Sequence, residues 1–133
     1  MTQAPSLPLS LWQAAKRGIR GRCPRCGEGR LFRAFLKPVD RCACCAIGWT
    51  PQRADDFPAY ISIFITGHLI TPLVMYLVLG TDMDTGAITA IVLPLTASLM
   101  LATLQPAKGA VIAMQWWNGM HGFVRGRRPV RPL

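Results

Sequence analysis

The sequence predicts an all-α membrane protein, in which a two-helix transmembrane hairpin follows a small N-terminal β unit and precedes a C-terminal amphipathic helix. The chain of 133 residues is 51% hydrophobic, yet its formal net charge is +9. Residues 58–105 contain no Lys or Arg, whereas residues 1–57 contain ten and residues 106–133 contain five. An apolar middle with basic flanks is typical of a membrane protein. Two Cys-x-x-Cys pairs ahead of the apolar segment predict the β unit.

Residues 1–22 are predicted to form a basic N-terminal arm. Leu9, Trp12 and Ile19 share one face of a short helix with cations beside it, which suits the headgroup zone of a membrane. A disordered tail fits the same composition. No cleavable signal peptide is expected, because no basic segment followed by an apolar run occurs near Met1.

Cys23, Cys26, Cys42 and Cys45 form a C-x2-C-x15-C-x2-C array. This spacing is typical of a tetrahedral zinc site, since each C-x2-C turn directs two sulfurs towards one ion. Residues 23–50 are therefore predicted to be a zinc ribbon, whose metal supplies folding free energy that so small a core lacks. The positive-inside rule places this basic segment in the cytoplasm, where disulfides are rare.

Two other interpretations of the array are iron in a rubredoxin-like site and a redox dithiol at Cys23 and Cys26. Cys44 is a fifth thiol that does not fit the x2 spacing. Gly27 follows the first pair at a position where a positive φ is useful, whereas Ala46 follows the second pair.

The ribbon is expected to contain three short strands, at residues 30–36, 39–41 and 47–50. Pro38 is expected to end the first strand. The neck at residues 51–58 joins the ribbon to the apolar segment. Asp55 or Asp56 is expected to cap the following helix, and Pro58 suits its first turn. A paired-carboxylate site at the membrane surface is the alternative for the two aspartates.

Residues 59–79 and 87–105 are predicted to be transmembrane helices, because each is apolar and about as long as a bilayer requires. The segment between them is short and contains Asp82 and Asp84, so the two helices are expected to run antiparallel. Lys and Arg on both flanks place both termini in the cytoplasm.

His68 is predicted to lie inside the bilayer. At about 1.5 Å per residue, it lies level with Thr96 and Ser98 of the second helix. A neutral histidine bonded to one of these hydroxyls is expected, since polar groups in hydrocarbon require a partner. A ligand, a proton relay and a contact with a partner protein are the alternatives.

Residues 107–124 are predicted to form an interfacial amphipathic helix on the inner leaflet, with Lys108 on its polar side. Ile112 and Trp116 lie on the apolar side. A third transmembrane span is the competing interpretation, but the segment is too short and too polar. The basic tail, residues 125–133, contains Arg125, Arg127, Arg128 and Arg131.

Several motifs together resemble a bacterial membrane family known as domain of unknown function 983. They are Cys-Pro-Arg-Cys-Gly-Glu-Gly-Arg-Leu-Phe at 23–32, a second Cys-x-x-Cys, Asp-Asp-x-Pro-Ala-Tyr at 55–60, Gly67-His68, and Pro-x-Lys-Gly-Ala at 106–110. The resemblance covers about residues 18–118, and the chain departs from it at Ala46, where a glycine is expected. It implies a zinc ribbon with two transmembrane helices in the bacterial inner membrane. Members are often encoded near cytochrome c oxidase assembly factors in alphaproteobacteria, which implies an association with respiratory-complex biogenesis.

The first functional hypothesis is a non-enzymatic adaptor or assembly factor that contacts anionic lipid headgroups and another membrane or cytoplasmic protein. The alternative is metal or thiol-redox handling at the membrane, through Cys44 and His68. Nucleic-acid binding by the basic ribbon is less favoured, because lipid headgroups account for its cations. An enzyme acting through Asp55, Asp56, His68 and Lys108 is not expected, since no nucleophile–base constellation is present.

Overall fold

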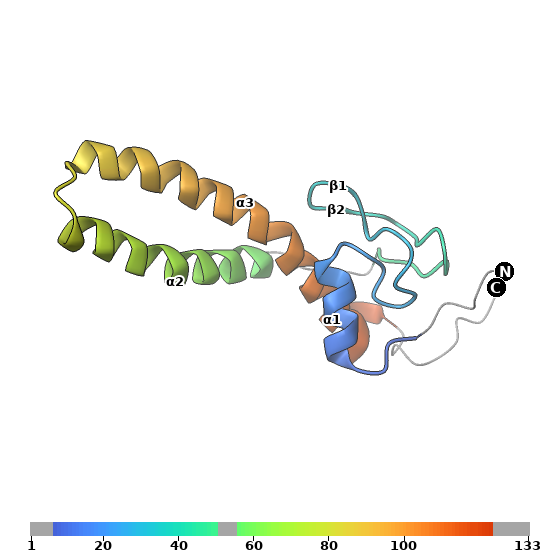
Figure 1. Ribbon diagram of the computed structural model, residues 1–133. Helices are drawn as coiled ribbons and strands as arrows, with labels where there is room; N and C mark the ends of the chain where they lie inside the picture. The colour runs from blue at the N-terminus through green and yellow to red at the C-terminus, as the bar shows by residue number, and fades with distance from the viewer. Residues whose placement is uncertain (1–6, 51–55, 124–133) are drawn as a thin grey trace.

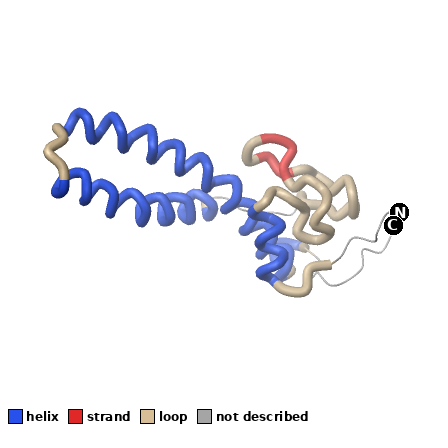
Figure 2. Tube along the Cα trace, viewed as in Figure 1, coloured by secondary structure: helices blue, strands red, loops and turns tan. Residues whose placement is uncertain are grey.

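The computed structural model describes residues 7–50 and 56–123. Two long helices, α2 and α3, lie side by side as an antiparallel pair and project from a head at one end (Figure 1). The head contains helix α1, the cysteine-rich loops with a small sheet, and the C-terminal part of α3 (Figure 2). This arrangement confirms the predicted fold class. The bounds of several helices and strands differ from the predicted ones.

The hairpin consists of α2, Phe57–Gly80, and the first part of α3, Thr85–Asn118. Pro58 lies in the first turn of α2, as expected. Asp84 begins α3 as its N-cap, because its carboxylate accepts hydrogen bonds from the N–H groups of Gly86 (3.0 Å) and Ala87 (3.4 Å). Both helices are long and apolar enough to cross a membrane, and few side chains in their most apolar stretches are buried.

Helix α3 continues through Pro106 to Asn118, so the separate amphipathic helix predicted at residues 107–124 is the last part of one longer helix. A proline inside a helix costs about 3 kcal/mol. Packing offsets this cost, because Ile112 and Trp116 are almost fully buried in the head. The prediction that their face lies on the inner leaflet is therefore wrong. Gly119 ends α3 in the left-handed conformation (φ 67°).

Helix α1, Leu11–Ile19, lies within the predicted basic N-terminal arm, where a short helix and a disordered tail were the two expectations. Ser10 caps it by accepting a hydrogen bond from the N–H of Gln13 at 3.2 Å. The helix docks on α3 along a face that includes Ala14 and Gly18, both buried. The sequence pattern missed this docking, because the small residues on the contact face carry little hydrophobic signal.

The sheet is smaller than predicted. It contains β1, Phe32–Ala34, and β2, Lys37–Pro38, which pair antiparallel. Pro38 thus lies within the second strand and does not mark the end of the first. The return strands expected at 39–41 and 47–50 are represented by a single bridge between Arg41 and Gly48. Most of the ribbon is loop held by buried side chains.

The neck and the tail lie largely outside the described residues, including Asp55 and residues 125–133. Asp56 precedes α2 at the N-cap position, but its side chain makes no capping hydrogen bond. The expected capping role is therefore wrong for Asp56.

Candidate metal centre

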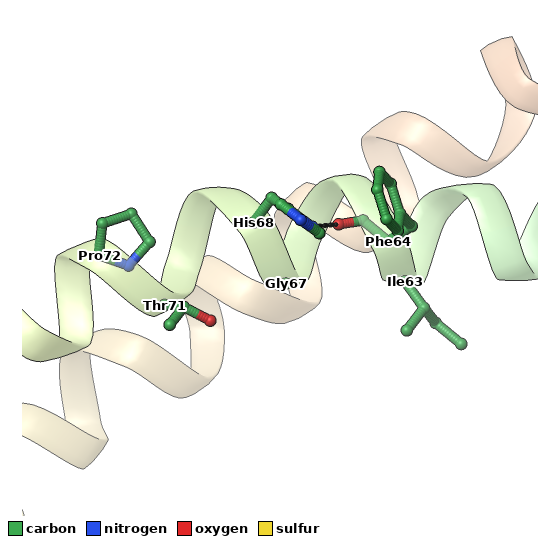
Figure 3. A pocket seen from close by; sticks show the side chains of 6 residues that line it. All are labelled: Ile63, Phe64, Gly67, His68, Thr71 and Pro72. Atoms are coloured by element: carbon green, nitrogen blue, oxygen red, sulfur yellow. Dashed lines mark hydrogen bonds between the residues drawn. The ribbon is translucent and has the colours of Figure 1, made fainter.

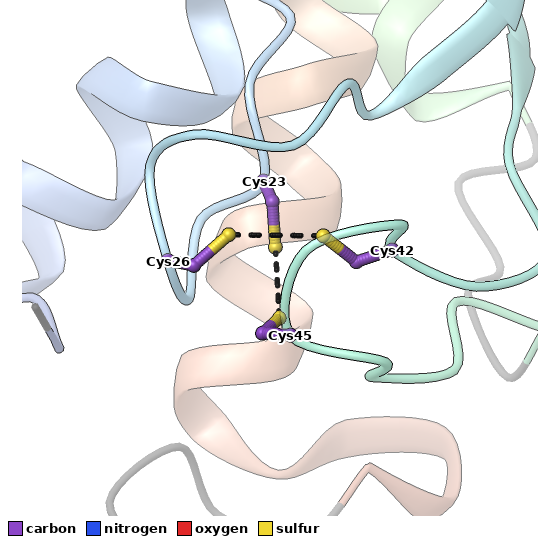
Figure 4. Close-up of side chains that lie close together, drawn as sticks. All are labelled: Cys23, Cys26, Cys42 and Cys45. Atoms are coloured by element: carbon purple, nitrogen blue, oxygen red, sulfur yellow. Dashed lines mark hydrogen bonds between the residues drawn. The ribbon is translucent and has the colours of Figure 1, made fainter. Parts of the chain in front are cut away.

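The sulfur atoms of Cys23, Cys26, Cys42 and Cys45 converge at the centre of the head (Figure 4). All four Sγ atoms lie within 4.8 Å of one another. The Sγ atoms of Cys23 and Cys45 are 3.7 Å apart, and so are those of Cys26 and Cys42. A tetrahedral zinc ion with Zn–S bonds of about 2.3 Å requires S···S separations of about 3.8 Å. The donor set and its spacing thus fit one tetrahedral metal ion.

The two Cys-x-x-Cys turns have matching backbone geometry. In the first, the N–H of Gly27 donates to the carbonyl of Cys23 at 2.7 Å. In the second, the N–H of Ala46 donates to the carbonyl of Cys42 at 3.0 Å. Gly27 has a φ of 74° and Ala46 a φ of 58°. Ala46 therefore adopts the left-handed conformation that glycine usually takes, at some cost in backbone strain.

Gly29 makes room for one of the sulfurs. A methyl group at this position would overlap the Sγ atom of Cys42. The N–H of Cys23 also donates to the carbonyl of Gly29 at 2.8 Å, which folds this segment back over the first turn. The absence of a side chain at Gly29 is thus part of how the second pair approaches the first.

Two arginines bind the backbone around the sulfurs. Arg17 of α1 donates from Nη1 to the carbonyls of Arg25 (3.1 Å) and Pro24 (3.4 Å). Arg25 donates to the carbonyl of Cys45 at 3.4 Å and so links the two turns. Four thiolates around a divalent ion carry net negative charge, which nearby guanidinium groups offset. The sequence singled out neither residue for this role.

Hydrogen bonds between the sulfurs change the pKa values of the cysteines. The Sγ atoms of Cys23 and Cys45 share a hydrogen bond, which lowers the pKa of Cys45 to about 5. The same hydrogen bond, together with burial, raises the pKa of Cys23. Burial also raises the pKa of Cys42. Zinc binds cysteine as the thiolate, so metal binding at this cluster releases the protons that the thiols hold.

Cys44 lies outside the cluster. Its side chain is exposed, and its thiol donates to Oε2 of Glu28 at 3.5 Å. This hydrogen bond raises the pKa of Cys44 to about 11. A thiol that stays protonated at neutral pH is a poor nucleophile and a poor metal ligand. These features favour a closed four-sulfur site over one in which Cys44 exchanges with a ligand.

The cluster belongs to the core of the head. Cys23, Cys26 and Cys42 are buried together with Leu31, Trp49, Ile112 and Trp116. The ring centroids of Trp49 and Trp116 lie 6.3 Å apart in an edge-to-face arrangement, and Phe123 packs 5.7 Å from Trp49. The metal site, the ribbon and the end of α3 therefore share one core.

His68 does not pair with the second helix as predicted. Its Nδ1 atom bonds the Phe64 carbonyl of its own helix at 2.9 Å, and its ring stacks on Phe64 (Figure 3). The hydroxyls of Thr96 and Ser98 bond the carbonyls of Val92 and Pro94 within α3. The physical reason is that the His68 side chain is exposed on α2, so it bonds a carbonyl one turn earlier on its own helix. His68 instead lines a shallow groove on α2 with Gly67, Thr71 and Pro72.

Ser62 joins the two long helices by hydrogen bonds. Its buried hydroxyl donates to the Met100 carbonyl at 3.0 Å and also bonds the Thr103 hydroxyl. Ser62 was not among the predicted site residues, although a serine in an apolar span is the usual signal for such a contact.

Lys108 contacts the backbone of the turn between β1 and β2. Its Nζ donates to the Leu36 carbonyl at 2.7 Å. Gln105, one turn earlier on α3, accepts from the Leu36 N–H at 3.2 Å. The structure thus gives Lys108 a contact with the backbone of the sheet, whereas a catalytic role had been considered for it.

The geometry defines a class of protein: a small head built around four converging cysteines, joined to a hairpin of two long apolar helices. A family model described as "Protein of unknown function (DUF983)" matches residues 32–116, more than half of the chain, and the chain belongs to this family. The match includes the second cysteine pair, all of α2 and all but the last two residues of α3. No curated protein and no solved structure matched the chain.

Proposed function

We propose that this chain is a zinc-ribbon integral membrane protein that acts without enzymatic activity, as an adaptor or assembly factor for another protein. In this proposal, α2 and the first part of α3 cross the bacterial inner membrane, and the head and both termini face the cytoplasm. The basic segments on both sides of the apolar hairpin support this orientation. Zinc is the proposed metal, because four thiolates in a closed tetrahedral site suit it.

One observation carries the proposal: α3 is continuous from the apolar hairpin into the core that surrounds the sulfurs. A closed four-cysteine site has no open position for a substrate, so its use is to stabilise the head. A stiff helix then fixes this head relative to the hairpin. A rigid head held at a membrane is suited to presenting a surface to a partner.

The test is purification of the full chain from native membranes in a mild detergent, with metal analysis and identification of co-purifying proteins. The proposal expects stoichiometric zinc and a stoichiometric partner. Cys26→Ser is expected to abolish both, whereas Cys44→Ser, the matched control, retains both. Subunits and assembly factors of cytochrome c oxidase are the first partners to test, because family members are often encoded near them. A zinc-loaded chain that purifies without a partner contradicts the adaptor role.

A further inference from the structure

The turn between β1 and β2 is fixed to α3 by both polar backbone groups of one residue. The Leu36 N–H donates to Oε1 of Gln105 at 3.2 Å, and the Leu36 carbonyl accepts from Nζ of Lys108 at 2.7 Å. Leu36 has a φ of 59°, a conformation that persists only where the surroundings hold it. The position of this turn relative to α3 is therefore determined by side chains that the helix supplies.

These contacts occur where the apolar part of α3 ends. Residues 87–105 contain no charged residue, and Lys108 is the first cation that follows them. The sheet lies beside this part of α3, next to the hairpin end of the head (Figure 1). If the apolar segment spans a bilayer, the turn is held at the level of the lipid headgroups.

The exposed side chains of the turn are of the kinds that bind at the lipid headgroups. Phe35 is 53% exposed at the tip, although it is a large apolar residue. Arg33 and Lys37, on either side of it, are also exposed. An aromatic ring between cations matches the boundary of an anionic membrane, where the ring enters the acyl region and the cations meet phosphates.

We propose that the turn at residues 33–37 is a membrane anchor whose Phe35 ring inserts into the bilayer surface while Arg33 and Lys37 bind the phosphates of anionic phospholipids. This proposal rests on the proposed membrane-spanning role of α2 and α3. The anchor adds a third attachment of the head to the membrane, besides the two helices. It sets the tilt of the metal-containing head, and thus the direction in which the remaining surface faces the cytoplasm.

The test uses the full chain in lipid nanodiscs. The variant Phe35→Cys, made in a Cys44→Ser background, is labelled with a nitroxide at position 35. Power-saturation measurements compare the access of oxygen, which enters lipid, with that of a water-soluble nickel chelate. In discs containing phosphatidylglycerol, the label is expected to be accessible to oxygen and protected from nickel. A label at Arg41→Cys is expected to show the opposite preference.

Matched charge variants test the role of the cations. Arg33→Gln with Lys37→Gln is expected to make the label at position 35 more accessible to the nickel chelate. Arg30→Gln with Arg41→Gln removes the same charge from exposed positions at the bases of the two cysteine turns, and is expected to leave the label unchanged. Equal effects of the two pairs overturn the specific role of Arg33 and Lys37. Zinc content, measured for every variant, shows that the head remains folded.

Extraction with alkaline carbonate separates failure of this proposal from failure of the proposed function. A chain that resists extraction, but whose label at position 35 is as accessible to nickel as the label at position 41, overturns the anchor alone. A chain that carbonate extracts from membranes overturns the membrane-spanning role as well. A label that is protected only in native membranes, and not in lipid nanodiscs, indicates a protein at this surface and also overturns the anchor.

Discussion

Gly18 of α1 and Gly109 of α3 meet with their backbones in direct contact, since a methyl group on either residue would overlap the carbonyl oxygen of the other. Such an approach is open only to residues without a side chain. The contact brings α1 against the end of α3 and so places Arg17, the neighbour of Gly18, over the first cysteine turn. One glycine pair thus connects the N-terminal helix to the metal site.

Gly18→Ala is therefore expected to destabilise the head by about 1–3 kcal/mol, as overpacking in a core typically does. The obstructing atoms are backbone, and they cannot rotate away. Chemical unfolding followed by near-ultraviolet circular dichroism of the buried tryptophans measures the effect. The control is Gly67→Ala in α2, where the added methyl group meets nothing within 4 Å. Equal stability of the two variants contradicts the close contact.

Ala46→Gly is expected to stabilise the second cysteine turn by about 1 kcal/mol, because glycine adopts the left-handed conformation without strain. The corresponding gain in metal affinity is about fivefold, measured by competition with a chelator. Ala43→Gly changes the same residue type within the same turn at a position with no positive φ. It is expected to give no gain, and a gain of similar size there contradicts the strain argument.

The reactivity of Cys44 is expected to be suppressed by Glu28. Hydrogen bonding to the carboxylate favours the thiol form and raises the pKa of Cys44 to about 11. Alkylation at pH 8 is therefore expected to speed up roughly tenfold in Glu28→Gln, since the larger thiolate fraction outweighs the lower nucleophilicity of each thiolate. Mass spectrometry of the zinc-loaded chain measures the rate. The wild-type rate is expected to keep rising as the pH approaches 11, and a plateau near pH 9 counts against the carboxylate effect.

Removing the side chains that hold Leu36 is expected to release the turn between β1 and β2. In Gln105→Leu with Lys108→Met, amide exchange at residues 33–38 is expected to become faster while the metal is retained, because the sulfurs lie elsewhere in the head. Hydrogen exchange with mass spectrometry measures this directly. Gln13→Leu, in the first turn of α1, serves as a control. Unchanged exchange at 33–38 in the double variant shows that the turn is held by other contacts.

The sequence predicts those features that depend on local spacing. The x2 spacings selected the same four cysteines whose sulfurs converge, and the charge-free segments predicted both long helices. The features it missed depend on contacts between distant segments. The apolar side of residues 107–118 was recognised, but periodicity does not reveal whether lipid or the ribbon covers such a face.

Other misses have the same origin. Gly18 and Gly109 are separated by most of the chain, and each appears alone as a helix-weakening residue. For His68, the depth along the hairpin was counted, but rotation about the helix axis decides which groups a side chain reaches. The tertiary arrangement supplies this information, and single-residue patterns do not.

Our central claim is that a single metal ion holds the ribbon, α1 and the end of α3 as one core. The direct test is amide exchange of the full chain in detergent before and after chelation, together with its zinc content. We expect one zinc ion per chain, and fast exchange at residues 111–117 after chelation while residues 87–100 stay protected. A chain that contains no metal, yet protects residues 111–117 fully, would contradict the claim.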